Sequence, residues 1–84
     1  METKKSNKNS PAKKFKAGAV TATIWKNQVS GNNKEPIEYF SISLERNYKD
    51  KSGVWQKTNS LRVNDIPKSM LVLQKAYEHL VLQD

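Results

Sequence analysis

The chain has 84 residues, a formal net charge of +7 and no cysteine. This length allows one domain with a small core. The lack of cysteine excludes disulfides and thiolate metal sites, and fits a reducing compartment, so we expect a cytoplasmic (nucleoid-associated) or nuclear protein. No apolar run approaches the roughly 18 residues of a membrane span, and the N-terminus lacks a secretory apolar segment. We therefore expect no membrane partner.

Residues 1–14 are predicted to form a disordered basic tail. They are rich in lysine, serine and asparagine, and hold Pro11 but no large apolar residue after Met1. The first 16 residues contain six lysines and one acid, a net +5 (6 − 1), which leaves +2 (7 − 5) for the rest. Such a tail attracts any polyanion with little selectivity. The alternative is an arm that only aids solubility.

Residues 15–84 are predicted to form an α+β domain, a curved antiparallel sheet of three to four strands followed by one C-terminal helix. Between Phe15 and Asn27, β-branched and aromatic residues in alternation indicate a strand. Gly18 inside it indicates a bulge or a bend, which leaves open a separate short strand at the Phe15 end. A polar loop follows over 28–36, with its tip at 31–33.

A β-hairpin is predicted between residues 39 and 63, with its turn at 50–53. In this register Tyr48 pairs with Trp55, and alternation assigns the two faces. One face is apolar in its lower half and ends in two aromatics among two cations: Arg46, Tyr48, Trp55 and Lys57. The other face is polar throughout, so a one-residue slip would bury polar groups. A weak stretch at 58–60 could divide the second arm into two strands.

A second aromatic cluster is predicted on the polar face. If Ile24 lies opposite Phe40, the apolar rows of neighbouring strands coincide, and the polar face then holds Trp25, Tyr39 and Arg62. Lys16 is a further candidate. Rings beside cations on a sheet suit single-stranded nucleic acid, where bases stack and phosphates need cations. We favour the Trp55 cluster, because its aromatics lie beside two cations. Either cluster could instead be structural, as a hairpin-closing pair, an edge cap or a subunit contact.

The last segment is predicted to be a helix with Asp65 or Asn64 as its N-cap and Pro67 near its first position. Its apolar residues recur at the spacing of a packed helix, and others widen the stripe: Ile66, Met70, Leu73, Tyr77 and Leu80, with Val72, Ala76 and Val81. This stripe is wider than one small sheet needs, so we expect a homodimer. The alternative is a helix that only covers its own sheet.

Catalytic chemistry has little support in the sequence. The single histidine, His79, lies on the predicted helix, and the acids are scattered without paired carboxylates or a metal set. The three glycines are isolated, so they form no phosphate-binding loop. We expect no enzymatic activity, no cofactor, no metal and no small-molecule substrate.

The order of three or four strands and a helix, with the start Phe15-Lys16-Ala17-Gly18, resembles the ββββα module of transcriptional coactivators of the positive-cofactor-four type. Plant Whirly proteins share this module, and PUR repeats share it more loosely. The nearest local match is Ile42 to Trp55, and Ser60-Leu61 before the helix is similar too. The resemblance covers roughly residues 15–80. It implies homodimers that bind single-stranded or melted DNA across their sheets, and its binding positions fall on Arg46, Tyr48, Trp55 and Lys57.

The sequence thus predicts a single-stranded DNA-binding protein with little sequence preference, acting in transcription, replication or repair. RNA binding is one alternative. Another is a protein-interaction module or small regulator whose exposed aromatics contact a different protein.

Overall fold

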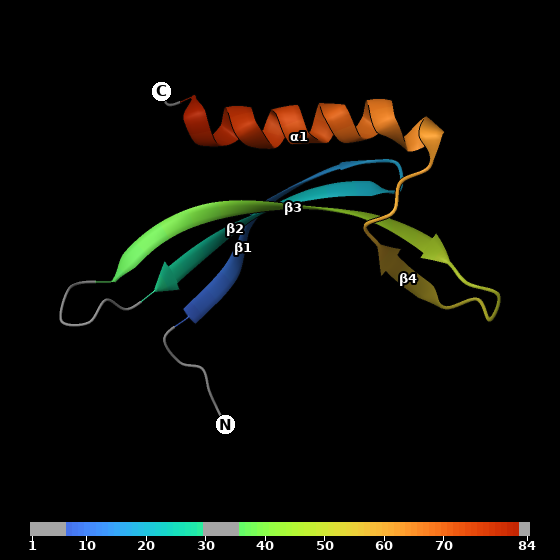
Figure 1. The fold of residues 1–84 in the computed structure, drawn as a ribbon, viewed down its shortest axis with the longest axis horizontal. Coiled ribbons are helices and arrows are strands. Elements are labelled where there is room, and N and C mark those ends of the chain that lie inside the picture. The colour runs from blue at the N-terminus through green and yellow to red at the C-terminus, as the bar shows by residue number, and fades with distance from the viewer. Residues whose placement is uncertain (1–6, 30–35, 83–84) are drawn as a thin grey trace.

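The computed structural model describes residues 7–29 and 36–82, and it shows four antiparallel strands followed by one helix (Figure 1). The predicted α+β fold is therefore confirmed. The sheet has the order β1-β2-β3-β4, and its strands are β1 (Asn7–Ala17), β2 (Val20–Val29), β3 (Ile37–Lys49) and β4 (Trp55–Thr58). A short 3-10 helix, η1 (Val63–Asp65), leads into α1 (Ile66–Val81). The predicted loop tip at 31–33 lies outside the described residues.

Gly18 lies in a tight turn that joins β1 to β2. Its φ is +62°, a left-handed conformation that glycine adopts easily and other residues only at about 1–2 kcal/mol. The separate strand at the Phe15 end is confirmed, but it is long and begins at Asn7. The prediction of a disordered tail is therefore wrong for residues 7–14, because their backbone pairs with β2. Residues 1–6 lie outside the described part of the chain.

The pairing of β2 with β3 differs from the predicted register by two residues. Ile24 lies opposite Ile42 instead of Phe40. Because side chains alternate with a period of two, a shift of two residues keeps every side chain on its predicted face. The apolar rows of the two strands therefore still coincide.

The pairing of β3 with β4 is shifted by one residue from the predicted register, so that prediction is wrong. Trp55 lies opposite Lys49 instead of Tyr48. The Asp50 carboxylate accepts the backbone N–H groups of Ser52 (2.9 Å) and Val54 (3.0 Å), and the Asp50 N–H donates to the Val54 carbonyl (2.9 Å). The loop therefore spans 50–54, one residue longer than predicted. Hydrogen bonds to the carboxylate, first from the Val54 N–H and then from the Gln56 side-chain amide, hold the pKa of Asp50 below its usual value.

The one-residue shift turns the side chains of β4 to the other face of the sheet. Trp55 and Lys57 now lie opposite the face that carries Arg46 and Tyr48. β4 also ends at Thr58, so the cross-strand pairs predicted beyond that residue do not form.

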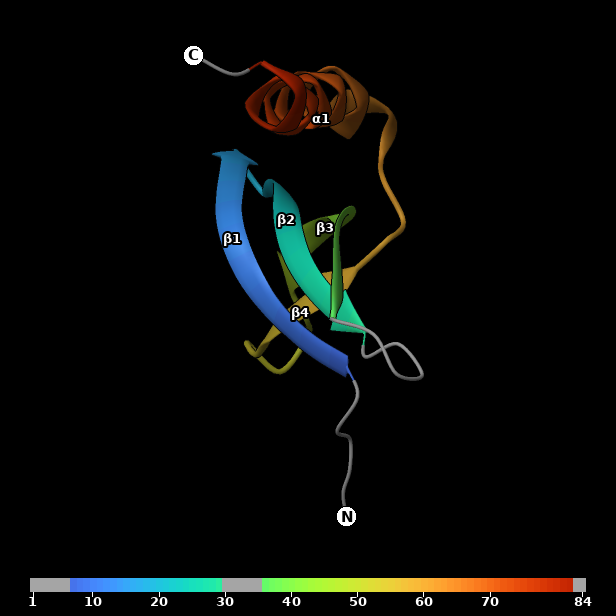
Figure 2. The same cartoon turned by 90° about the vertical axis from the view of Figure 1, so that its left-hand side faces the viewer.

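Helix α1 packs on one face of the sheet, mainly over β1 and β2 (Figure 2). It begins after Asp65, as predicted, with Pro67 in its first turn. The buried apolar core is small and consists of Val20, Ala22, Ile24, Val72 and Ala76. Small helix residues face the sheet, because they let the helix approach closely. Four large residues of the predicted stripe stay exposed: Ile66, Met70, Leu73 and Tyr77.

Candidate nucleic-acid interface

The face of the sheet opposite α1 is called the open face below, and no helix of residues 7–29 and 36–82 lies over it (Figure 2). The strand registers place aromatic, basic and polar side chains from all four strands on this face. They include Lys14, Lys16, Thr21, Thr23, Trp25, Tyr39, Ser43, Glu45, Asn47, Lys49, Trp55 and Lys57. Four lysines and one glutamate give this set a net charge of +3 (4 − 1).

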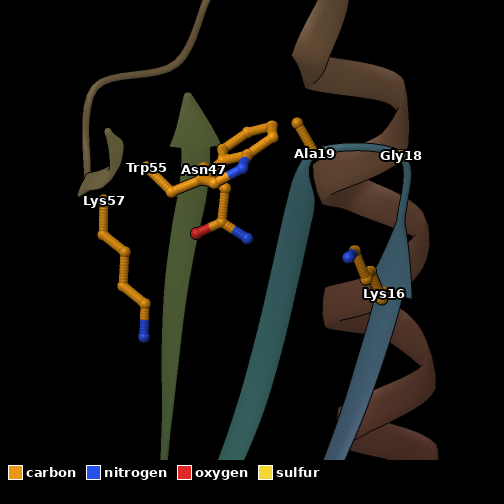
Figure 3. Close-up of a pocket in the computed structure, with 6 residues that line it drawn as sticks. All are labelled: Lys16, Gly18, Ala19, Asn47, Trp55 and Lys57. Carbon is orange, nitrogen blue, oxygen red and sulfur yellow. The ribbon is translucent and has the colours of Figure 1, made fainter. Parts of the chain in front are cut away.

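Trp55 is the most exposed ring on the open face. Its side chain is 66% exposed, and the Lys49 Nζ lies 5.5 Å from the ring centroid. A cavity of about 530 Å³ adjoins the ring, bordered by Lys16, Gly18, Ala19, Asn47, Trp55 and Lys57 (Figure 3). The wall of this cavity thus combines an indole, two ammonium groups and an amide.

A second cavity, of about 260 Å³, shares three of these residues, so the two form one continuous groove. The shared residues are Lys16, Asn47 and Lys57, and the second cavity adds Lys14, Thr21, Thr23 and Glu45. The Lys57 Nζ lies 3.7 Å from a Glu45 carboxylate oxygen, but its side chain remains largely exposed. This groove runs across β1, β2, β3 and β4.

The other aromatics of the open face lie further along β2 and β3. The indole N–H of Trp25 donates to the Ser43 hydroxyl (2.9 Å), and the Asn27 side-chain amide donates to the Ser41 hydroxyl (3.0 Å). Tyr39 lies opposite Asn27 and is exposed. Trp25, Tyr39 and Trp55 therefore share one face, whereas the sequence had assigned Trp55 to the other.

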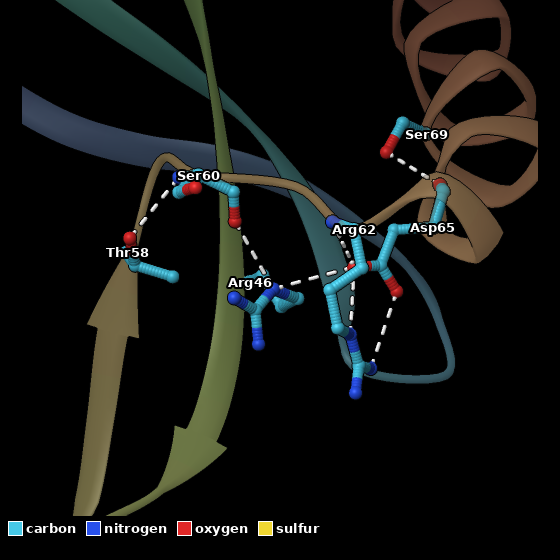
Figure 4. A network of polar contacts seen from close by, with 6 residues as sticks. All are labelled: Arg46, Thr58, Ser60, Arg62, Asp65 and Ser69. Atoms are coloured by element: carbon cyan, nitrogen blue, oxygen red, sulfur yellow. Dashed lines mark hydrogen bonds and ion pairs between the residues drawn. The ribbon is translucent and has the colours of Figure 1, made fainter.

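Arg46 and Tyr48 lie on the helix side of the sheet, away from the groove. Figure 4 shows Arg46 beside Ser60 and Asp65. The Arg46 Nε donates to the Ser60 carbonyl (3.0 Å) and lies 3.3 Å from the Asp65 carboxylate. The Arg46 side chain is only 14% exposed, and its guanidinium lies 5.5 Å from the centroid of the Tyr48 ring. Arg46 therefore joins β3 to the start of the helix.

Arg62 also contacts Asp65 and lies outside the sheet. Its backbone N–H (2.8 Å) and its Nε (3.2 Å) both donate to one Asp65 carboxylate oxygen. Hydrogen bonds from the side chain and then the backbone of Arg62, with the charges of Arg62 and Arg46, hold the pKa of Asp65 below its usual value against the opposing effect of burial. Of the eight predicted site residues, the structure brings together Lys16, Trp25, Tyr39, Trp55 and Lys57, and it places Arg46, Tyr48 and Arg62 elsewhere.

Sequence reasoning named neither Lys14 nor Lys49 as a binding residue, although both lie on the open face. Lys14 and Lys16 are two residues apart, which is the spacing of one strand face, but this signal is visible only once residues 7–17 are recognised as a strand. Lys49 lies beside Trp55 only in the observed register of β3 and β4, which differs from the predicted one.

The chain matches no protein-family model, no curated protein and no solved structure. The resemblance to the coactivator module therefore stays a prediction. Within residues 7–29 and 36–82, no helix is long and apolar enough to cross a membrane, and no three acidic or histidine side chains are grouped to hold a metal ion.

Proposed function

We propose that this protein binds single-stranded nucleic acid on the open face of its sheet, with little sequence preference. The supporting observation is the gathering of three aromatic rings and four lysines on a face that no helix covers. The choice of DNA over RNA, and a place in transcription, replication or repair, rests on the resemblance described above.

Each component of the open face suits one part of a single strand. An exposed ring such as Trp55 offers a stacking surface for any base, worth about 1–3 kcal/mol per base. Lys14, Lys16 and Lys57 border the groove at positions where they can neutralise phosphates. The hydroxyl and amide groups between them add hydrogen bonds that do not depend on base identity.

A matched pair of lysine variants tests the proposal. Lys14 lies on the open face, whereas Lys13 lies on the helix side, opposite Ile24, with its Nζ 5.6 Å from the Phe15 ring centroid. Lys14→Gln and Lys13→Gln change the net charge equally. Only Lys14→Gln should weaken binding to labelled oligo-dT and reduce the slope of log K against log salt, by about 0.7 for one lost phosphate contact.

Fluorescence anisotropy at several salt concentrations measures both quantities, with duplex DNA and poly-U as further ligands. Equal effects of the two variants would show that net charge matters and the open face does not. A contact with another protein through the same aromatics would be far less sensitive to salt. Failure to bind oligo-dT at low salt would refute the proposed function.

A further inference from the structure

Most of strand β3 has no neighbour on its outer edge. β3 runs from Ile37 to Lys49, but only its last four residues, from Arg46 on, pair with β4 (Figure 1). Among the described residues, no strand pairs with 37–45 on that side. These nine residues therefore present a long strand edge.

The direction of the backbone groups on β3 follows from two hydrogen bonds. The Asn47 N–H donates to the Ala19 carbonyl, toward β2, whereas the Leu44 carbonyl accepts from the Asn59 side chain on the outer side. Backbone groups of successive residues in a strand point to opposite edges. The N–H and C=O groups of Glu38, Phe40 and Ile42 therefore point outward, where they can pair with another strand.

This edge lacks most of the features that protect edge strands from pairing, although it carries two charged side chains, Glu38 and Glu45. Proline, lysine and bulges are the usual protection, and β1, the strand at the other side of the sheet, has Pro11, a register shift after it, and several lysines. In contrast, residues 37–45 contain no proline, no lysine and no register shift, and Phe40 and Ile42 are exposed.

An apolar stripe of α1 lies on the same side of the molecule as this edge. Lys68 and His79 lie on the flank of α1 that faces β1, because the Lys68 Nζ lies close to Gly18 and the His79 ring is 5.9 Å from that of Phe15. At about 100° per residue, the exposed stripe falls on the other flank, toward β3. It consists of Ile66, Met70, Leu73 and Tyr77.

The stripe and the exposed side chains of β3 form one large apolar surface. Phe40 is 49% and Tyr77 62% exposed. At 150–250 Å² per aromatic side chain, these two alone expose roughly 200 Å², and four aliphatic side chains add to this. Such a surface is comparable with the largest apolar patch that a monomer usually leaves uncovered, a few hundred Å².

The single chain is also not compact. Its radius of gyration is 15.9 Å, against about 12 Å for a compact domain of 84 residues. Among the residues that the structure describes, only five apolar residues are buried in the core. A second copy would supply the missing cover.

We propose that two copies of this chain pair through the outer edges of their β3 strands, antiparallel and about a two-fold axis near Phe40, to form one continuous eight-stranded sheet. The two-fold symmetry makes the same edge serve both copies. Pairing places Phe40 and Ile42 of both copies side by side on the helix side, between the two apolar stripes. The open faces of both copies stay uncovered and become one surface.

Two helix variants with matched exposure test this surface. Tyr77 belongs to the stripe, whereas Leu71, which is 51% exposed, lies about a third of a turn away around the helix axis. In sedimentation equilibrium, the unmodified chain should give 19.2 kDa (2 × 9.6 kDa). Tyr77→Glu should weaken the dimer at least tenfold, and Leu71→Glu should leave it unchanged.

A second pair of variants tests the strand edge itself. Phe40→Pro and Phe40→Ala both remove the ring, but only proline removes the outward N–H, which no neighbouring strand in the described chain uses. Proline should therefore weaken the dimer at least tenfold more than alanine, while circular dichroism shows that both variants remain folded.

A monomer of 9.6 kDa at 100 µM protein, or equal effects of Tyr77→Glu and Leu71→Glu, would overturn the dimer. Equal effects of folded Phe40→Pro and Phe40→Ala would overturn the pairing of the β3 edges. None of these measurements uses nucleic acid, so they are independent of the proposed function.

Discussion

Replacement of Trp55 by alanine, compared with replacement of Tyr48, separates the open face from the cluster predicted from the sequence. The predicted hairpin register placed the two rings side by side, so both substitutions would weaken binding. In the structure they lie on opposite faces, and only Trp55 borders the groove. Trp55→Ala should therefore weaken the binding of single strands, whereas Tyr48→Ala should not.

The expected loss of affinity follows from the exposure of the ring. A Trp55 side chain that is 66% exposed leaves a stacking surface free, and loss of one stacked base costs about 1–3 kcal/mol. This corresponds to a roughly 5- to 150-fold weaker complex. The buried third of the side chain, about 70 Å², contributes at most about 2 kcal/mol to folding, so some loss of stability accompanies the change.

Anisotropy titrations with labelled oligo-dT at one fixed salt concentration measure the effect. Thermal unfolding followed by circular dichroism identifies the temperature range in which both variants are folded. Equal weakening by Tyr48→Ala and Trp55→Ala would contradict the assignment of the open face. So would unaltered binding by folded Trp55→Ala.

Two further predictions concern stability. Because the fold lowers the pKa of Asp65, its carboxylate stabilises the protein fully above its unfolded pKa of about 3.9, and this contribution is lost as the pH falls through the lower folded pKa. Asp65→Asn should therefore destabilise the protein at pH 7 and reduce the loss of stability below about pH 4. An unchanged acid transition, measured by urea unfolding at each pH, would argue against this role. Deletion of residues 1–14 should abolish cooperative unfolding, because it removes most of β1 from the sheet; a truncated chain with an unchanged melting temperature would show that β1 is dispensable.

The fold could be predicted from the sequence where local signals were strong. The alternation of β-branched residues identified β2. The N-cap residue Asp65 and Pro67 identified the start of α1. β1 was missed because its first half is polar. The backbone of that half forms hydrogen bonds with β2, and an edge strand of an antiparallel sheet tolerates polar side chains that face solvent.

The candidate site was harder to predict, because one additional residue in the β3–β4 loop turns every side chain of β4 to the other face of the sheet. The Asp50 carboxylate accepts two backbone N–H groups in the loop and lengthens it to five residues. This moves Trp55 and Lys57 away from Arg46 and Tyr48. The two-residue error between β2 and β3 had no such effect, so Trp25 and Tyr39 kept their predicted face.

The shortness of β4 gives the two ends of the groove different mechanical properties. β4 has four residues and pairs only with the end of β3, and none of its residues belongs to the buried core. Local opening of so small a unit costs much less than global unfolding. Trp55 and Lys57 can therefore adjust to nucleic-acid strands of different shape. Lys14 and Lys16 lie on β1, which pairs with β2 along its length and packs under α1, so their positions stay fixed.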